Sequence, residues 1–154
     1  MPLFQFVGTA SGGYLGDRFN KRLIAGIAML MHGVGLLSLT YASHWLLIAV
    51  FVVLHGLAWG ARGPQMAAIR ADYFGTSSFS TIMGISSLII TIFAISGPLL
   101  AGALADSTGD YQVGFTIISC LTAVGFVFFA FATPPTKTPA SAGRVAEPAR
   151  LGRR

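Results

Sequence analysis

Four long stretches of the sequence contain no charged residue, and this feature limits the possible folds more than any other. The stretches span residues 23–42, 45–61, 82–104 and 113–132. A helix needs about 20 mainly apolar residues to cross the hydrocarbon core of a bilayer. We therefore expect four membrane-spanning helices, of which the second continues past its short apolar run through Pro64. A fifth apolar, glycine-rich stretch at 3–15 is too short, and we expect it to be the second half of a truncated span.

The composition supports a membrane protein and excludes most soluble classes. Hydrophobic residues make up 54% of the chain and charged residues only 10%, whereas a soluble domain carries about 25% charge. The single cysteine, Cys120, excludes a disulfide framework and a cysteine-based metal cluster. The sequence also lacks phosphate-loop, metal-ligand and catalytic patterns. It therefore predicts an all-α, polytopic membrane helix bundle that is not an enzyme and carries no cofactor or metal.

The basic residues give the orientation. If the chain crosses the bilayer at every span, all ten Lys and Arg fall on one side. The segments on that side are 16–22, 62–81 and 133–154. In the opposite loops, 43–44 and 105–112, the only charged residues are Asp106 and Asp110. Because Lys and Arg are retained in the cytoplasm, we expect a multi-pass protein of the plasma (inner) membrane with a cytoplasmic C-terminus. The basic charge then needs no nucleic-acid partner.

Small residues indicate where the helices pack. Membrane helices associate through close contact of small side chains, because lipid tails are as apolar as leucine. Glycines recur at four-residue spacing at 8, 12 and 16, and again at 56 and 60. Later in the chain, Gly97 and Pro98 precede Gly102, and we expect a bent, closely packed helix there because Pro98 removes a backbone hydrogen bond.

The loop at 13–22 carries the most specific motif. It reads Gly-x-x-x-Asp-Arg-x-x-Lys-Arg, formed by Gly13, Gly16, Asp17, Arg18, Lys21 and Arg22. This pattern resembles the signature loop of the major facilitator superfamily, a large group of secondary transporters. Asn20 replaces a family glycine, and Asn tolerates a left-handed turn. Gly13 and Gly16 would allow close helix approach, and Asp17 would lie at the positive end of a neighbouring helix. We expect the motif residues to act in gating.

Three further segments are similar to the same superfamily. Residues 70–75 resemble the inner loop after the tenth helix, 97–102 the eleventh helix, and 106–111 the last outer loop. The resemblance implies that residues 1–132 are the end of helix eight through helix twelve of a twelve-helix carrier. Residues 133–154 would then be a disordered, basic cytoplasmic tail, and the N-terminal half of the carrier would be the missing partner. A competing placement assigns the chain to helices two to six.

The resemblance implies a secondary active transporter that moves a small solute by alternating access. The sequence Arg-Ala-Asp-Tyr-Phe-Gly at 70–75 is also similar to the branch that carries monocarboxylates, oxalate and formate, which suggests an organic anion. Coupling to protons stays open. The alternative is a small standalone four-span protein that works as an oligomeric exporter or as a structural or interaction subunit.

Five residues are candidates for solute binding. His32 and His55 lie near the middle of their spans, where polar groups are candidates for function. Arg62 follows the second span near its inner end, with Trp59 and Gln65 close by. A histidine at that depth would bind an anion or relay a proton, or it would simply bond to a backbone carbonyl or to a neighbouring helix. An arginine there would attract a carboxylate, or it would extend to the interface or close a gate.

Overall fold

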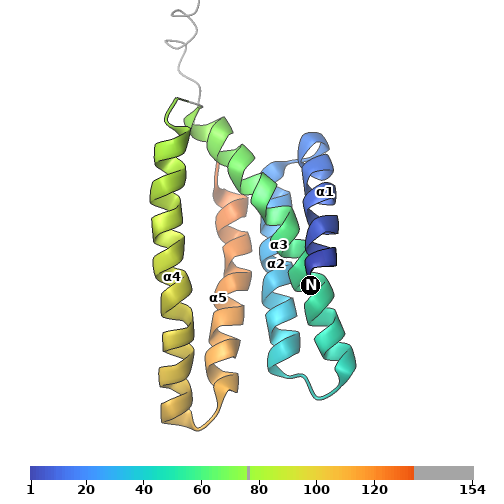
Figure 1. The fold of residues 1–154 in the computed structure, drawn as a ribbon, viewed down its shortest axis with the longest axis vertical. Helices are drawn as coiled ribbons and strands as arrows, with labels where there is room; N and C mark the ends of the chain where they lie inside the picture. The colour runs from blue at the N-terminus through green and yellow to red at the C-terminus, as the bar shows by residue number, and fades with distance from the viewer. Residues whose placement is uncertain (76, 134–154) are drawn as a thin grey trace, which may run out of the picture.

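The computed structural model describes residues 1–75 and 77–133, which form five α-helices (Figure 1). The helices are α1 (Pro2–Arg18), α2 (Lys21–Thr40), α3 (Trp45–Phe74), α4 (Phe79–Thr108) and α5 (Tyr111–Phe131). Four of them, α2 to α5, are long and apolar enough to cross a membrane. The predicted all-α membrane bundle is therefore confirmed. The predicted tail lies, beyond its first residue, outside the described residues.

Successive helices run in opposite directions, as the charge pattern predicts. In Figure 1, α1, α3 and α5 end at the upper edge of the bundle, where α2 and α4 begin. The two links at the lower edge join α2 to α3 and α4 to α5. The described Lys and Arg therefore belong to segments that reach the upper edge, and the acidic 105–112 segment lies at the lower one.

Two links are much shorter than predicted. The inner segment 62–81 is helical up to Phe74 and again from Phe79, so the assignment of 70–75 to a loop is wrong. Gly75 ends α3 with φ of 74°, a conformation that disfavours side chains. In the outer segment 105–112, left-handed Gly109 ends α4, and the side chain of Asp110 caps α5. Capping residues thus define these helix ends, which hydropathy cannot locate.

Asn20 acts as a cap and does not form the left-handed turn that we expected. Its φ is −65° and its side chain accepts a hydrogen bond from the backbone N–H of Arg22 at 3.0 Å. This contact satisfies one of the free N–H groups at the start of α2. Asn20, which stands where the family has a glycine, therefore caps the start of α2, because Asn is among the preferred N-cap residues.

The predicted glycine faces of α1 and α3 pack against each other. A Cβ on Gly8 would collide with the backbone of Leu57, and one on Gly60 would collide with the backbone of Gln5. A hydroxyl contact supports the same interface, because Thr9 Oγ1 lies 3.3 Å from the carbonyl oxygen of Gly60. Glycine on both helices therefore brings the two backbones into contact, which is the usual basis of helix association in lipid.

Helix α5 packs on α2, and α4 lies at the edge of the bundle (Figure 1). Only Ala101 and Ala105 of α4 are buried, and Ala101 packs against Gly114 of α5. Many apolar side chains of α4 are exposed: Ile85, Leu88, Ile89, Ile92, Phe93, Ile95, Leu99 and Leu100. Pro98 lies inside the continuous helix. A Cβ on Gly97 or Gly102 would meet no other described residue within 4 Å, so their packing role stays a prediction.

Candidate functional site

The structure brings the two mid-span histidines into direct contact. Nδ1 of His32 on α2 lies 3.1 Å from Nδ1 of His55 on α3, and the rings meet edge to face. One ring must donate and the other accept, so this contact holds one proton between the two nitrogens. His32 is only 5% exposed, and its Nε2 makes no hydrogen bond among the described residues. The pair thus forms a polar centre inside the bundle, in which the buried Nε2 of His32 is unused among the described residues.

Trp59 and Arg62 extend this centre along α3. The ring of Trp59 stacks on His55 at a centroid distance of 5.9 Å and meets His32 edge to face at the same distance. The guanidinium carbon of Arg62 lies 5.6 Å from the centre of the Trp59 ring, within the range of a cation–π contact. Because these α3 residues follow one another at four- and three-residue spacing, they share one helix face.

These side chains line a cavity of about 210 Å³. We call it the histidine cavity, and its walls are Met29, His32, Leu36, His55, Trp59, Arg62 and Thr122. Its only permanent charge is the guanidinium of Arg62, and no carboxylate lines it among the described residues. A guanidinium binds carboxylates through paired, charge-assisted hydrogen bonds. The cavity is therefore suited to an anion and disfavours a cation. Within the described ranges, no group of three or more potential metal ligands occurs.

Gln65 lies elsewhere, at the contact between α1 and α3. It is buried, and its Nε2 donates to the carbonyl oxygen of Gly12 at 2.5 Å. A Cβ on Gly16 would collide with the Gln65 amide, so the motif glycine provides space for this side chain. A Cβ on Gly13 would meet no other described residue within 4 Å, so the close approach expected there stays a prediction. The structure thus does not bring Gln65 into the histidine cavity.

The basic side chains of the signature loop connect three helices at the upper edge. Lys21 Nζ lies 2.7 Å from Oδ2 of Asp72 at the end of α3. Arg22 Nη1 donates to the carbonyl oxygen of Ala132 at 2.6 Å, and the Tyr73 hydroxyl donates to the same oxygen at 2.7 Å. Carbonyl groups at a helix C-terminus lack intrahelical partners and attract cations. The loop therefore joins the ends of α2, α3 and α5.

Asp17 and Arg18 remain on the last turn of α1 and are exposed. The guanidinium of Arg18 lies 4.6 Å from the centre of the Tyr14 ring, one turn earlier on the same helix. Among the described residues, Asp17 makes no side-chain hydrogen bond or ion pair. The expected contact of Asp17 with a neighbouring helix end is thus absent from this part of the chain, and the gating role of both residues stays a prediction.

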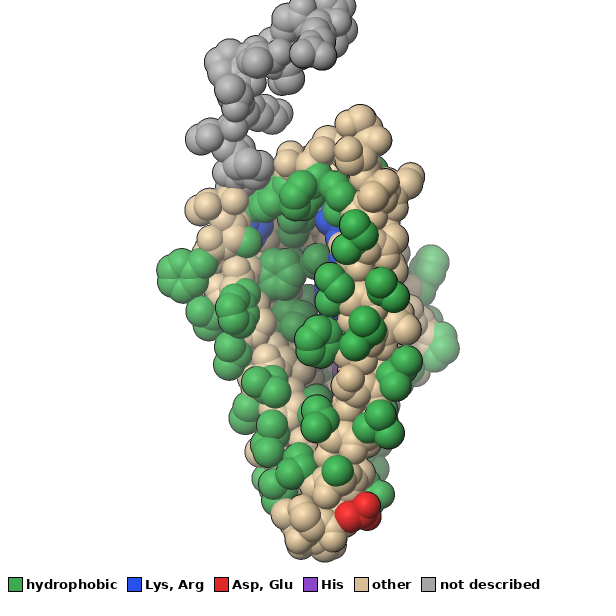
Figure 2. Space-filling model, turned by 90° about the vertical axis from the view of Figure 1, so that its left-hand side faces the viewer, with side chains coloured by type: hydrophobic (Ala, Val, Ile, Leu, Met, Phe, Trp, Pro, Cys, Tyr) green, Lys and Arg blue, Asp and Glu red, His purple; other side chains and the backbone are tan. Residues whose placement is uncertain are grey.

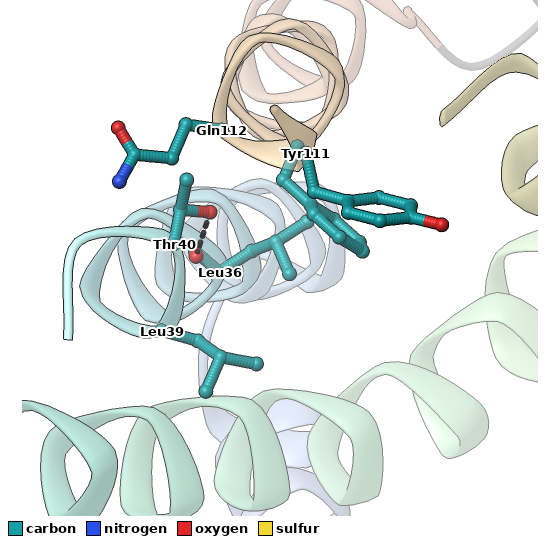
Figure 3. Close-up of a pocket in the computed structure, with 6 residues that line it drawn as sticks. Leu36, Leu39, Thr40, Tyr111 and Gln112 are labelled. Carbon is teal, nitrogen blue, oxygen red and sulfur yellow. Dashed lines mark hydrogen bonds between the residues drawn. The ribbon is translucent and has the colours of Figure 1, made fainter. Parts of the chain in front are cut away.

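A second pocket of about 230 Å³ lies at the lower end, between α2 and α5 (Figure 3). It is lined by Leu36, Leu39, Thr40, Tyr111, Gln112 and Phe115. Its threonine hydroxyl is already bonded to the carbonyl oxygen of Leu36 at 2.8 Å. No charged residue is among its described walls, so this pocket supplies no opposite charge for an anionic solute.

The sequence did not predict a further cavity among the described residues, which has a volume of about 660 Å³. It lies between α3 and α4, and Arg62 and Arg70 both line it. In the sequence, Arg70 indicates only orientation, and the pair Ser86–Ser87 belongs to an apolar span. A usable signal existed, because the two arginines are eight residues apart on one helix and the serines interrupt a hydrophobic run.

Comparison with known proteins gives the family. The sequence matches the profile of the Major Facilitator Superfamily over residues 1–153. The chain belongs to the major facilitator superfamily. The resemblance drawn from the signature loop is thereby confirmed, and the four apolar spans agree with a multi-pass membrane protein of this superfamily.

The most similar curated relatives in this superfamily include monocarboxylate transporters. The chain is 28% identical to monocarboxylate transporter 3 of Gallus gallus over 127 residues, covering 75% of this chain and 23% of the relative. It is 30% identical to monocarboxylate transporter 12 of Xenopus laevis over 134 residues, covering 81% and 29%. Protein spinster homolog 3 of Danio rerio is 26% identical over 125 residues, covering 79% and 25%. The names of the first two agree with the branch suggested by residues 70–75.

The chain spans less than a third of the length of these relatives. No solved structure matches it significantly.

Proposed function

We propose that the chain forms part of a secondary carrier that moves a small organic anion across the membrane by alternating access. Its residues 1–132 would correspond to the end of the eighth through the twelfth helix of a twelve-helix carrier. The share of the relatives that the chain covers, 23% and 29%, fits a part of such a carrier, and the resemblance of residues 70–75, 97–102 and 106–111 favours this placement. We also propose that the arginine-rich edge faces the cytoplasm of a plasma (inner) membrane, because basic loops are retained there.

The observation that carries the proposal is the contact between Arg62 and Trp59 beside the histidine pair. Charged groups at membrane depth are costly, and they persist where they serve a pathway or a binding site. Arg62 supplies the positive charge, and Trp59 holds the guanidinium over its ring. Two relatives that bear the name monocarboxylate transporter support a carboxylate as the anion.

The histidine pair is our candidate for the coupled proton. Its rings share one proton at the Nδ1 contact, and the unused Nε2 of His32 offers a second position. An imidazole changes charge near neutral pH in water, which makes it a common proton carrier. A carboxylate that enters beside the pair would bring a counter-charge for an added proton. Anion and proton would then cross together.

Uptake by the reconstituted protein tests the proposal. The protein is purified at the full length that its native gene produces. It is then placed in liposomes and assayed for exchange of radiolabelled acetate. We expect Arg62→Gln to lower the exchange rate about tenfold or more, because a charge-assisted contact contributes roughly 1.5–3 kcal/mol. Arg62→Lys should retain part of the activity, since the charge is kept.

Gly84→Ala provides the control for folding and handling, because a Cβ there meets nothing within 4 Å among the described residues. Equal exchange by Arg62→Gln and by Gly84→Ala would contradict the proposed role of Arg62. An unmodified protein that exchanges no carboxylate would overturn the proposed function.

A further inference from the structure

The large cavity between α3 and α4 is lined by both polar and apolar side chains. The polar ones are Arg62, Arg70, Ser86 and Ser87. Apolar side chains line the rest: Met29, Met66, Met83, Ile89, Ile90, Phe93 and Phe129, together with Gly63. Such a lining of mainly apolar walls with a few placed polar groups is typical of small-molecule sites.

The two guanidinium groups in this cavity are available for a ligand. Among the described residues, neither arginine contacts a carboxylate, and the one ion pair there joins Lys21 to Asp72. Arg62 and Arg70 donate only to methionine sulfurs in this part of the chain, at 4.0 Å and 3.3 Å. Sulfur is a weak acceptor, so an anionic oxygen would replace these contacts readily.

The cavity opens on the side of the bundle where α4 lies. Figure 2 views this side and shows an opening rimmed by hydrophobic side chains, with the blue of Lys or Arg side chains in its depth. Its volume of about 660 Å³ is three times that of the histidine cavity, at about 210 Å³. Ligand sites for drug-sized molecules measure about 300–1,000 Å³. The larger cavity thus exceeds the needs of a two- or three-carbon acid.

Arg62 and Met29 line both cavities, which makes them neighbours with a common wall. Arg70 follows Arg62 by eight residues, about 12 Å along the helix. A carboxylate at the common wall therefore has a second cation farther along the larger cavity. An apolar tail beside it would lie against the methionine, isoleucine and phenylalanine side chains.

We propose that this cavity binds an amphipathic anion, with the acidic head group on Arg62 and Arg70 and the apolar tail against the methionine, isoleucine and phenylalanine side chains of the cavity. The proposal deepens the proposed function, on which it rests, by extending the solute class to carboxylates with a bulky apolar tail. A free carboxylate and the head group of an anionic lipid share this chemistry. Serine hydroxyls from α4 add neutral donors to the same head group.

Binding to the protein in nanodiscs tests the proposal, with radiolabelled 4-phenylbutyrate and acetate as probes. We expect 4-phenylbutyrate to bind at least about tenfold more tightly than acetate, because its apolar carbons are buried in the cavity. Arg70→Gln should weaken 4-phenylbutyrate binding about tenfold, the loss of one charge-assisted contact. Arg70→Lys should recover part of this loss.

A second pair of variants keeps the test independent of Arg70. Ile90→Trp fills the cavity and should remove most 4-phenylbutyrate binding. Ile95→Trp is the matched control, because Ile95 is an exposed residue of the same helix that does not line the cavity. Nanodiscs of neutral phosphatidylcholine with and without phosphatidylglycerol separate the two sources. Competition by phosphatidylglycerol that requires Arg70 identifies a lipid, and its absence identifies the free carboxylate.

The outcomes separate this inference from the proposed function. Acetate binding with no preference for 4-phenylbutyrate would overturn the inference alone. Equal effects of Ile90→Trp and Ile95→Trp would do the same. A protein that binds neither anion would overturn both.

Discussion

Nζ of Lys21 at the start of α2 lies 2.7 Å from Oδ2 of Asp72 near the end of α3. The contact joins the signature loop to the Arg-Ala-Asp-Tyr-Phe-Gly segment, two of the four segments that carry the family resemblance. Both side chains are partly exposed, at 32% and 54%. Exposed ion pairs contribute about 0.2–1 kcal/mol, so this pair is suited to a link that forms and breaks.

We therefore expect Lys21→Met and Asp72→Asn to lower the free energy of unfolding by no more than about 1 kcal/mol. Both should slow anion exchange, because the ends of α2 and α3 are no longer held together. The charge-reversed double variant, Lys21→Asp with Asp72→Lys, should restore much of the rate. Exchange in liposomes and thermal unfolding check this. A reversed pair no faster than the single variants would show that the contact has no part in transport.

The contact between α1 and α3 gives a matched pair of glycine variants. A Cβ on Gly12 would lie 2.6 Å from Cα of Ala61, whereas one on Gly13 would meet nothing within 4 Å among the described residues. We expect Gly12→Ala to destabilise the protein by about 1–3 kcal/mol through overpacking. Gly13→Ala should be neutral or stabilise it by up to about 1 kcal/mol, because alanine favours helix. Unfolding in detergent measures both, and equal effects would contradict the packing of these helices.

Gln65 is expected to stabilise the fold and not to bind the solute. Its amide donates to the Gly12 carbonyl oxygen at 2.5 Å and does not line the histidine cavity. Gln65→Met should cost about 0.5–2 kcal/mol of stability, in the range of hydrogen bonds between membrane helices. The KM for the anion should change by less than about twofold, because the residues that line the histidine cavity are unchanged. A large rise in KM at unchanged stability would restore Gln65 to the solute site.

The contact between His32 and His55 predicts that substitutions of the two histidines have non-additive effects on proton-linked uptake. Because His32 and His55 share one proton at their Nδ1 contact, either ring alone loses the shared function. We expect His32→Phe and His55→Phe each to remove most proton-linked uptake, and the double variant to be no worse than either single one. A pH-sensitive dye inside the liposomes reports the proton. Losses that simply add would show that the two rings act separately.

The sequence located the spans but not their ends. Uncharged runs predict helices because a bilayer requires them, whereas helix ends depend on local caps. Gly75 and Asp110 end or begin helices within segments that hydropathy assigns to loops. The sequence also predicted the glycine faces of α1 and α3, because their four-residue spacing is a local pattern.

The site was only partly predictable. Depth in the span singles out His32 and His55, but their contact depends on how α2 and α3 are rotated against each other, which sequence spacing within one helix does not give. The same reason explains the misplaced Gln65, which faces α1. Arg70 escapes notice because one basic residue near a span end looks like an orientation signal, and the cavity that gives it another role requires the position of α4.

Trp59 provides the most direct test of the central claim that an anion binds at Arg62. The chain has two tryptophans, and Trp45 is 78% exposed at the far end of the same helix. In the Trp45→Phe protein, fluorescence therefore reports on the ring that lies 5.6 Å from the Arg62 guanidinium carbon. We predict that a carboxylate changes this fluorescence with a saturating dependence on concentration, and that Arg62→Gln removes the change. An unchanged signal, or an equal response in Arg62→Gln, would contradict the account.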